Sequence, residues 1–128
     1  MTILVQHAPT LGTLSKALQS LHYSLLEYQA YRSGFTGSPL DLFDRATKGG
    51  DFAWLRPLRE AIVTLDERRA DNAPLDAAEV AAISDWIGDM LDADDSPLRV
   101  GMNAAYQHDA TAIVACRSAR RALSNLAA

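Results

Sequence analysis

The sequence is poor in the residues and segments that build a disulfide, a metal centre or a membrane anchor. Cys116 is its only cysteine, which excludes an intramolecular disulfide and a cysteine-rich metal site. No stretch approaches the roughly 18 consecutive apolar residues that a membrane span needs. The N-terminal segment lacks the basic region and the long apolar core of a signal peptide. We therefore expect a cytoplasmic protein that makes no contact with a membrane.

Motifs typical of enzymes are also lacking. The chain has no phosphate-binding glycine motif, no nucleophile elbow and no pair of zinc-ligating histidines. None of its three histidines, His7, His22 and His108, has a Glu three residues before it, which is the spacing used by di-iron bundles. These absences predict no catalytic residue, no metal site and no cofactor. An enzyme therefore ranks behind binding functions.

Positive charge is in the minority. Twelve Lys and Arg residues against sixteen Asp and Glu residues give a formal net charge of −4. Nucleic-acid binding needs a clustered positive face, and we find no helix pair with basic residues on the first turns of a recognition helix. The sequence therefore predicts no nucleic-acid partner. Between Arg69 and Arg99 the chain contains acidic residues and no basic one, a run typical of a solvated helix face.

Residues that favour strands are sparse, and apolar residues instead recur at three- and four-residue steps, the period of an amphipathic helix. The longest such stripe has six members: Leu11, Leu14, Leu18, Leu21, Leu25 and Tyr28. Near the end of the chain the inward-facing residues are expected to be Ile113, Cys116, Leu123 and Leu126. A chain of 128 residues suits one compact domain. We predict a single all-α domain over residues 1–128, an antiparallel helical bundle of four long helices and two short ones.

Capping residues mark the expected helix boundaries. The residues suited to N-cap positions are Thr10, Ser38, Asp76 and Asp109. Pro57 either marks the true start of the third helix or kinks it. The predicted helices cover residues of about 10–33, 39–48, 51–70, 76–92, 97–107 and 110–126. Residues 1–9 are then expected to form a mobile N-terminal arm.

Residues 52–67 read FAWLRPLREAIVTLDE. This segment resembles one found in small, uncharacterised, helical bacterial proteins. Those proteins similarly place a long leucine-rich helix before a Ser-Pro-Leu helix start, and an arginine-rich helix at the end. The resemblance covers most of the chain, but only residues 52–67 are specific, and the flexible pair Gly49 and Gly50 before them departs from the pattern. It implies an all-helical bacterial domain and no particular activity.

Three residues on apolar helix faces are candidates for a ligand site. His22 lies inside the leucine stripe of the first helix, and Tyr28 ends that stripe. Trp54 lies on the inward arc of the third helix. The plain interpretation of His22 and Trp54 is a role in the core, but a largely apolar pocket also needs a few polar groups of this kind.

Two charged residues complete the candidate ligand site. Asp66 and Arg120 each fall at the edge of the buried arc of their helices, where an ion needs a partner. We expect Asp66 to be partly buried and to pair with Arg120, Arg69 or Arg59. A pocket that used all five candidates would draw on His22, Tyr28, Trp54, Asp66 and Arg120.

Large aromatic residues are candidates for an interface. Trp86 lies at one edge of the apolar stripe of its helix, and Phe52 lies in the first turn of the predicted third helix; aromatic residues, tryptophan above all, are enriched at protein interfaces. Because no chemical constellation is present, the leading interpretation is a non-enzymatic helical bundle that acts through protein–protein contacts, either as a homodimer or with an unidentified protein partner. The alternative is a bundle that binds a small molecule or an anion in an interior pocket.

Overall fold

A computed structural model describes the backbone of residues 2–127 and the side chains of residues 11–126. Within this part the chain is built of helices and contains no strand, which confirms the all-α fold class. In chain order the elements are α1 (Thr2–Arg32), α2 (Pro39–Lys48), the 3₁₀ helix η1 (Gly50–Leu55), α3 (Arg56–Ala70), α4 (Ala77–Asp92), α5 (Pro97–His108) and α6 (Ala110–Ala127).

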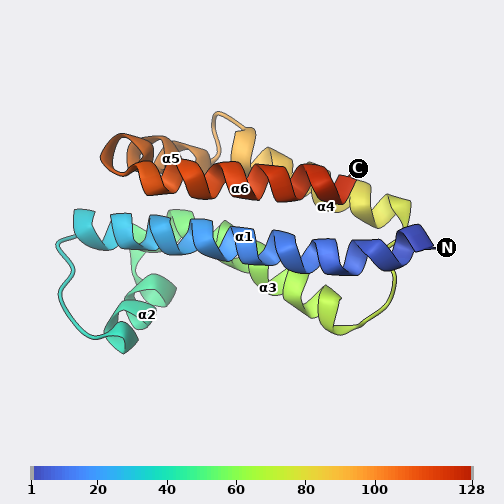
Figure 1. Cartoon of the computed structure of the whole chain (residues 1–128). Helices are drawn as coiled ribbons and strands as arrows, with labels where there is room; N and C mark the ends of the chain where they lie inside the picture. Colours follow the sequence, from blue (N-terminus) through green and yellow to red (C-terminus); the bar gives the residue numbers. More distant parts are fainter. Residues whose placement is uncertain (1, 128) are drawn as a thin grey trace.

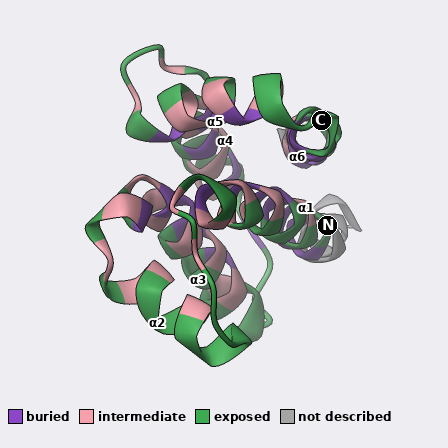
Figure 2. Cartoon of the chain, turned by 90° about the vertical axis from the view of Figure 1, so that its left-hand side faces the viewer, coloured by how far each residue is buried: buried purple, intermediate pink, exposed green. Residues whose placement is uncertain are grey.

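The helices form two layers, and α1 runs along the length of the molecule (Figure 1). The first layer holds α1, α2 and α3, and the second holds α4, α5 and α6, as the end-on view shows (Figure 2). Helix α6 lies beside α1 and runs in the opposite direction. Helix α3 packs against another side of α1. Helix α1 therefore has α6 on one side and α3 on the other.

Two predicted boundaries need correction. Helix α1 begins at Thr2 rather than near residue 10, so Thr10 lies within a helix that continues through Pro9 and is not its N-cap. The backbone of the predicted N-terminal arm, residues 1–9, is thus helical from Thr2 onward, and its side chains lie outside the described residues. A capping residue is also tolerated inside a helix, which is why Thr10 by itself is a weak start signal.

The third predicted helix divides into two elements. Residues from Gly50 to Leu55 form η1, and α3 begins at Arg56 with Pro57 in its first turn. Pro57 therefore marks the helix start, where a missing N–H costs no hydrogen bond. The predicted caps at Ser38 and Asp76 are confirmed, and both residues form complete capping boxes.

The core joins a stripe of large residues on α1 to a stripe of small residues on α6. The α1 leucines are completely buried or nearly so: Leu11, Leu14, Leu18, Leu21 and Leu25. The buried face of α6 consists mainly of alanine: Ala112, Ala115, Cys116, Ala119, Ala122 and Leu126. Ile113, predicted to face inward, is instead 38% exposed. Small side chains allow the backbones of α1 and α6 to approach closely, so the alanine face rather than the most hydrophobic arc turns toward α1.

Candidate functional site

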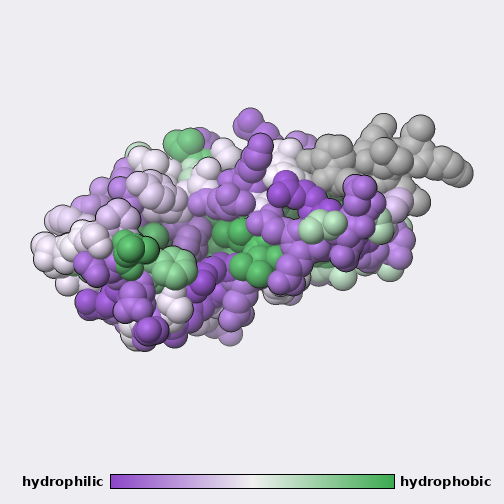
Figure 3. All heavy atoms as spheres, turned by 90° about the horizontal axis from the view of Figure 1, so that it is seen from below, coloured by the Kyte–Doolittle hydropathy of each residue, from purple (hydrophilic) through white to green (hydrophobic). Residues whose placement is uncertain are grey.

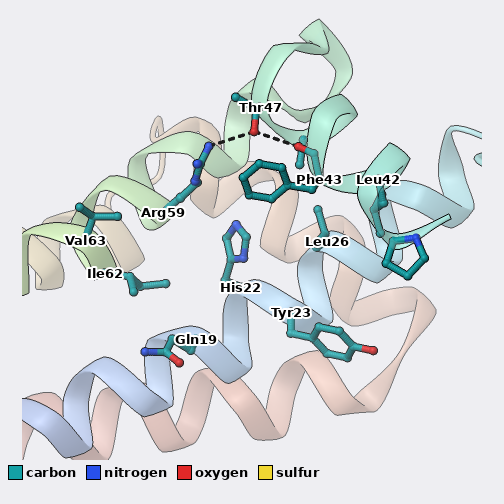
Figure 4. Close-up of a pocket in the computed structure, with 12 residues that line it drawn as sticks. Gln19, His22, Tyr23, Leu26, Leu42, Phe43, Thr47, Arg59, Ile62 and Val63 are labelled. Carbon is teal, nitrogen blue, oxygen red and sulfur yellow. Dashed lines mark hydrogen bonds between the residues drawn. The ribbon is translucent and has the colours of Figure 1, made fainter. Parts of the chain in front are cut away.

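A cavity of about 420 Å³ lies between α1, α2 and α3 and is partly open to solvent (Figure 4). Its walls are mostly apolar. Leu26 comes from α1, Leu42 and Ala46 from α2, and Ile62 from α3. The volume falls in the range of small-molecule pockets.

The position of α2 explains why the cavity stays open. Helix α2 contains no buried residue, and Figure 2 shows it in the colours of exposed and half-buried residues only. The loop before it carries Gly34 and Gly37, both with positive φ angles of 64° and 155°, a conformation that favours glycine. Beyond its other end, Asp51 accepts hydrogen bonds from Arg45 (2.9 Å) and Ser33 (2.6 Å). Helix α2 is thus held by these polar contacts and by Arg59, with only partial packing of Leu42 and Ala46 against the core.

His22 is one of the polar residues that line this cavity. Its imidazole points from α1 toward Phe43 of α2 (Figure 4). Burial, and then the positive charge of Arg59, lower the pKa of His22 below its ordinary value. The imidazole is therefore neutral at pH 7 and has both a donor and an acceptor nitrogen.

Arg59 is another polar residue that lines the cavity. Its Nη1 donates a hydrogen bond to Thr47 Oγ1 (3.3 Å), and its guanidinium carbon lies 5.4 Å from the centroid of the Phe43 ring. Thr47 in turn donates to the Phe43 carbonyl (2.8 Å). Among the residues that the structure describes, no carboxylate forms an ion pair with Arg59. A cation without a counter-ion therefore borders an apolar cavity.

Two of the predicted ligand residues, Tyr28 and Trp54, lie outside this cavity. They line a separate hollow where α1, η1 and α5 meet. Trp54 Nε1 donates to Gln29 Oε1 (2.8 Å), and the Trp54 ring covers Gly101, where an added Cβ would lie only 2.2 Å from the ring. Tyr28 packs near the His108 ring, with centroids 5.5 Å apart. Both side chains thus hold α1 to neighbouring elements.

Asp66 lies between α1 and α3. It accepts a short hydrogen bond from Ser15 Oγ (2.6 Å) and lies 3.6 Å from Arg69 Nη2. Arg69 is one of the three arginines predicted as its partner. Ser15 was not predicted, although its position between Leu14 and Leu18 on a buried face signals a hydroxyl that needs a partner.

Arg120 lies in the other layer and does not meet Asp66. It pairs with Asp92 at the end of α4 and donates to the Leu91 carbonyl (3.4 Å). Tyr106 of α5 belongs to the same cluster. Its pKa is raised above the ordinary value, chiefly by burial and then by a hydrogen bond with the Cys116 thiol of α6. This cluster joins α4, α5 and α6 and faces none of the other candidates.

The two residues predicted for an interface differ in accessibility. Phe52 is completely buried in the core, so its ring is unavailable to a partner. Its place in η1, directly under α1, explains this burial. Trp86 is 39% exposed and borders a shallow hollow between α3 and α4 together with Ile83.

The structure therefore brings only His22, of the five predicted ligand residues, into the cavity. Sequence reasoning missed Arg59 as a possible ligand contact and considered it only as a partner for Asp66. No local sequence pattern signals this role, because it depends on where α2 lies relative to α1 and α3. Among the described residues, no cluster of three His, Cys, Asp or Glu side chains is placed to hold a metal ion. None of the described helices combines the length and the apolar character that crossing a membrane requires.

Comparison with known proteins gives no match: no family model fits the sequence, and neither a curated protein nor a solved structure is significantly similar. The resemblance of residues 52–67 to helical bacterial proteins stays a prediction.

Proposed function

We propose that this protein is a non-enzymatic interaction module that forms a homodimer through the outer face of α2. The observation that carries the proposal is that α2 buries none of its residues and yet presents Leu40 (80% exposed) and Phe43 (60% exposed) to solvent. Tyr23 of α1 and Val63 of α3, also exposed, border the same cavity as Phe43. We call these four residues the α2 apolar face.

An apolar surface of this kind is costly to leave in water. Figure 3 views the α2 and α3 side of the molecule and shows hydrophobic groups gathered among hydrophilic ones. Single exposed apolar residues are ordinary on a protein surface, whereas a group of large ones marks an interaction site. Aromatic residues such as Phe43 and Tyr23 are the usual anchors of such sites.

The charges on α2 favour a second copy as the partner. Asp44 and Lys48 lie one turn apart on α2, form an ion pair of 2.9 Å and are both largely exposed. A two-fold interface brings the same patch of both subunits together. When two α2 helices cross in opposite directions, Asp44 of one copy would face Lys48 of the other. The surface is thus complementary to itself in charge as well as in hydrophobicity.

The test is the mass of the protein in solution for two matched variants. Leu40→Glu places a charge on the α2 apolar face, and Val114→Glu places the same charge on an exposed residue of α6 in the other layer. We expect light scattering to find a dimer for the wild type and for Val114→Glu, and a monomer for Leu40→Glu, each with unchanged helical circular dichroism. A wild type that is monomeric at every concentration overturns the proposal.

A further inference from the structure

We propose that the cavity between α1, α2 and α3 binds a monocarboxylate with an unbranched apolar chain, such as a medium-chain fatty acid. The carboxylate would pair with Arg59, and the chain would lie among Leu26, Leu42 and Ile62. The site adjoins the homodimer surface, because Tyr23, Phe43 and Val63 of the α2 apolar face also line the cavity. Leu40, the most exposed residue of that face, does not line it, so Leu40→Glu tests the dimer without changing the cavity wall.

The shape and the walls of the cavity suit a flexible apolar chain. A volume of about 420 Å³ accepts a small amphiphile, and typical ligand pockets combine apolar walls with a small number of polar groups that set the orientation. In this cavity such polar groups include the side chains of Arg59 on α3 and of His22 and Gln19 on α1. One polar end and one apolar body are therefore the chemistry that the site recognises.

The lack of a carboxylate partner for Arg59 indicates that the polar end of the ligand carries a negative charge. Four of the ten arginines have carboxylate partners in the described part of the chain, namely Arg45, Arg68, Arg69 and Arg120, and Arg59 is among those that have none. Arg59 has a hydroxyl and an aromatic ring as its partners. A guanidinium forms its strongest hydrogen bonds, often two in parallel, with a carboxylate. A ligand carboxylate would supply the counter-ion that the fold does not.

His22 adds a second donor without adding charge. Because its pKa is lowered by burial and by Arg59, the neutral imidazole can donate one N–H to a carboxylate oxygen in the cavity. The same lowered pKa keeps His22 from repelling the guanidinium nearby. The pair therefore offers donors to both oxygens of a carboxylate at the cost of a single positive charge.

Helix α2 allows a ligand to enter. Since α2 contains no buried residue, an outward shift of this helix would break only the partial apolar packing of Leu42 and Ala46 and the contacts of Arg59 with Thr47 and Phe43. The ligand would then regain apolar contacts with Leu42 and Ala46, which now face the partly open cavity.

The experiment is a calorimetric titration with sodium decanoate, below the concentration at which it forms micelles, against the folded full chain. Decan-1-ol has the same chain without the charge, and acetate has the charge without the chain. We expect saturable binding of decanoate, binding at least about tenfold weaker for decan-1-ol, and none for acetate, because charge-assisted hydrogen bonds and chain burial both contribute.

Three variants locate the site. Arg59→Gln should weaken decanoate binding about tenfold or more, and Ala46→Leu should abolish it by filling the cavity. Arg117→Gln removes an exposed arginine of α6 and should leave binding unchanged. Equal affinity for decanoate and decan-1-ol, or an equal loss in Arg59→Gln and Arg117→Gln, would overturn the proposal, as would the absence of binding. Leu40→Glu should bind decanoate like the wild type, so failure of the dimer and failure of this site are distinguishable.

Discussion

The two sides of α1 are packed in different ways. On the side of α6, completely buried leucines such as Leu18 meet a face made mainly of alanine, typified by Ala119, and the contact is extensive. On the side of α2, the same helix borders a cavity of about 420 Å³, and the helix across that cavity has no buried residue. Two sides of one helix can therefore differ in how tightly they pack.

The difference follows from how each helix is held. Helix α6 contacts α1, α4 and α5 along its length, so its small residues are covered from several directions. Helix α2 is short and is held at its ends by the Ser38 cap and by the Arg45–Asp51 ion pair. The first arrangement contributes stability, and the second leaves room and exposed surface for binding.

The largest expected effect comes from a substitution in the core between α1 and α6. Leu18→Ala removes a completely buried side chain and should lower the free energy of unfolding by about 2–5 kcal/mol. Leu42→Ala, which makes the same change at the edge of the cavity, should cost about 1 kcal/mol or less because its side chain is only half-buried. Urea denaturation of both variants measures the difference. Equal losses would show that α2 packs as tightly as α6.

A larger side chain should destabilise the protein between α1 and α6 but not beside the cavity. Ala119→Leu places a large side chain where none fits and should destabilise the protein by about 1–3 kcal/mol. Ala46→Leu adds the same atoms beside the cavity and should be neutral or slightly stabilising. Melting temperatures of the two variants provide the comparison. A loss for Ala46→Leu as large as that for Ala119→Leu would mean that the cavity is already filled.

The contact between Gly101 of α5 and the Trp54 ring of η1 is a close fit away from both α6 and the cavity. Gly101→Ala should destabilise by about 1–3 kcal/mol, because the new Cβ would overlap the Trp54 ring. In a Trp54→Leu background the same substitution should instead be neutral or stabilise by up to about 1 kcal/mol, because alanine favours a helix more than glycine does. Urea denaturation of the wild type, the two single variants and the double variant measures whether Gly101→Ala stabilises or destabilises the protein in each background. A gain in stability for Gly101→Ala alone contradicts the contact.

The smallest expected effect is a change in stability with pH that is caused by His22 beside the cavity. The pKa of His22 lies below its ordinary value in the folded protein, so the unfolded chain binds the proton more readily. The stability that neutral His22 contributes is complete above the unfolded pKa of about 6.5 and decreases as the pH falls through it. The midpoint of urea denaturation should therefore fall less between pH 7.5 and 5.5 in His22→Gln than in the wild type. An identical fall in both proteins would exclude His22 as a cause.

Much of the fold was predictable because local signals agreed. The stripe from Leu11 to Leu25 identified α1, and the capping boxes at Ser38 and Asp76 marked the starts of α2 and α4. The candidate site was harder to predict. His22 was identified, but Tyr28, Trp54, Asp66 and Arg120 lie in other contacts, because a helical wheel places a residue on a face and does not say which helix covers that face.

The sequence by itself determined that the chain is helical and marked the starts of α2 and α4, since helix period and caps depend on residues within a few positions of one another. It also determined that the leucine stripe of α1 from Leu11 to Leu25 is buried. Only the tertiary structure decided that alanines rather than Ile113 turn toward α1, that Phe52 is enclosed, and that α2 stands away from α1 and α3 with Arg59 beside the gap. Those outcomes depend on how closely two backbones approach and on what remains to cover each face, and both are settled only when all the helices pack together.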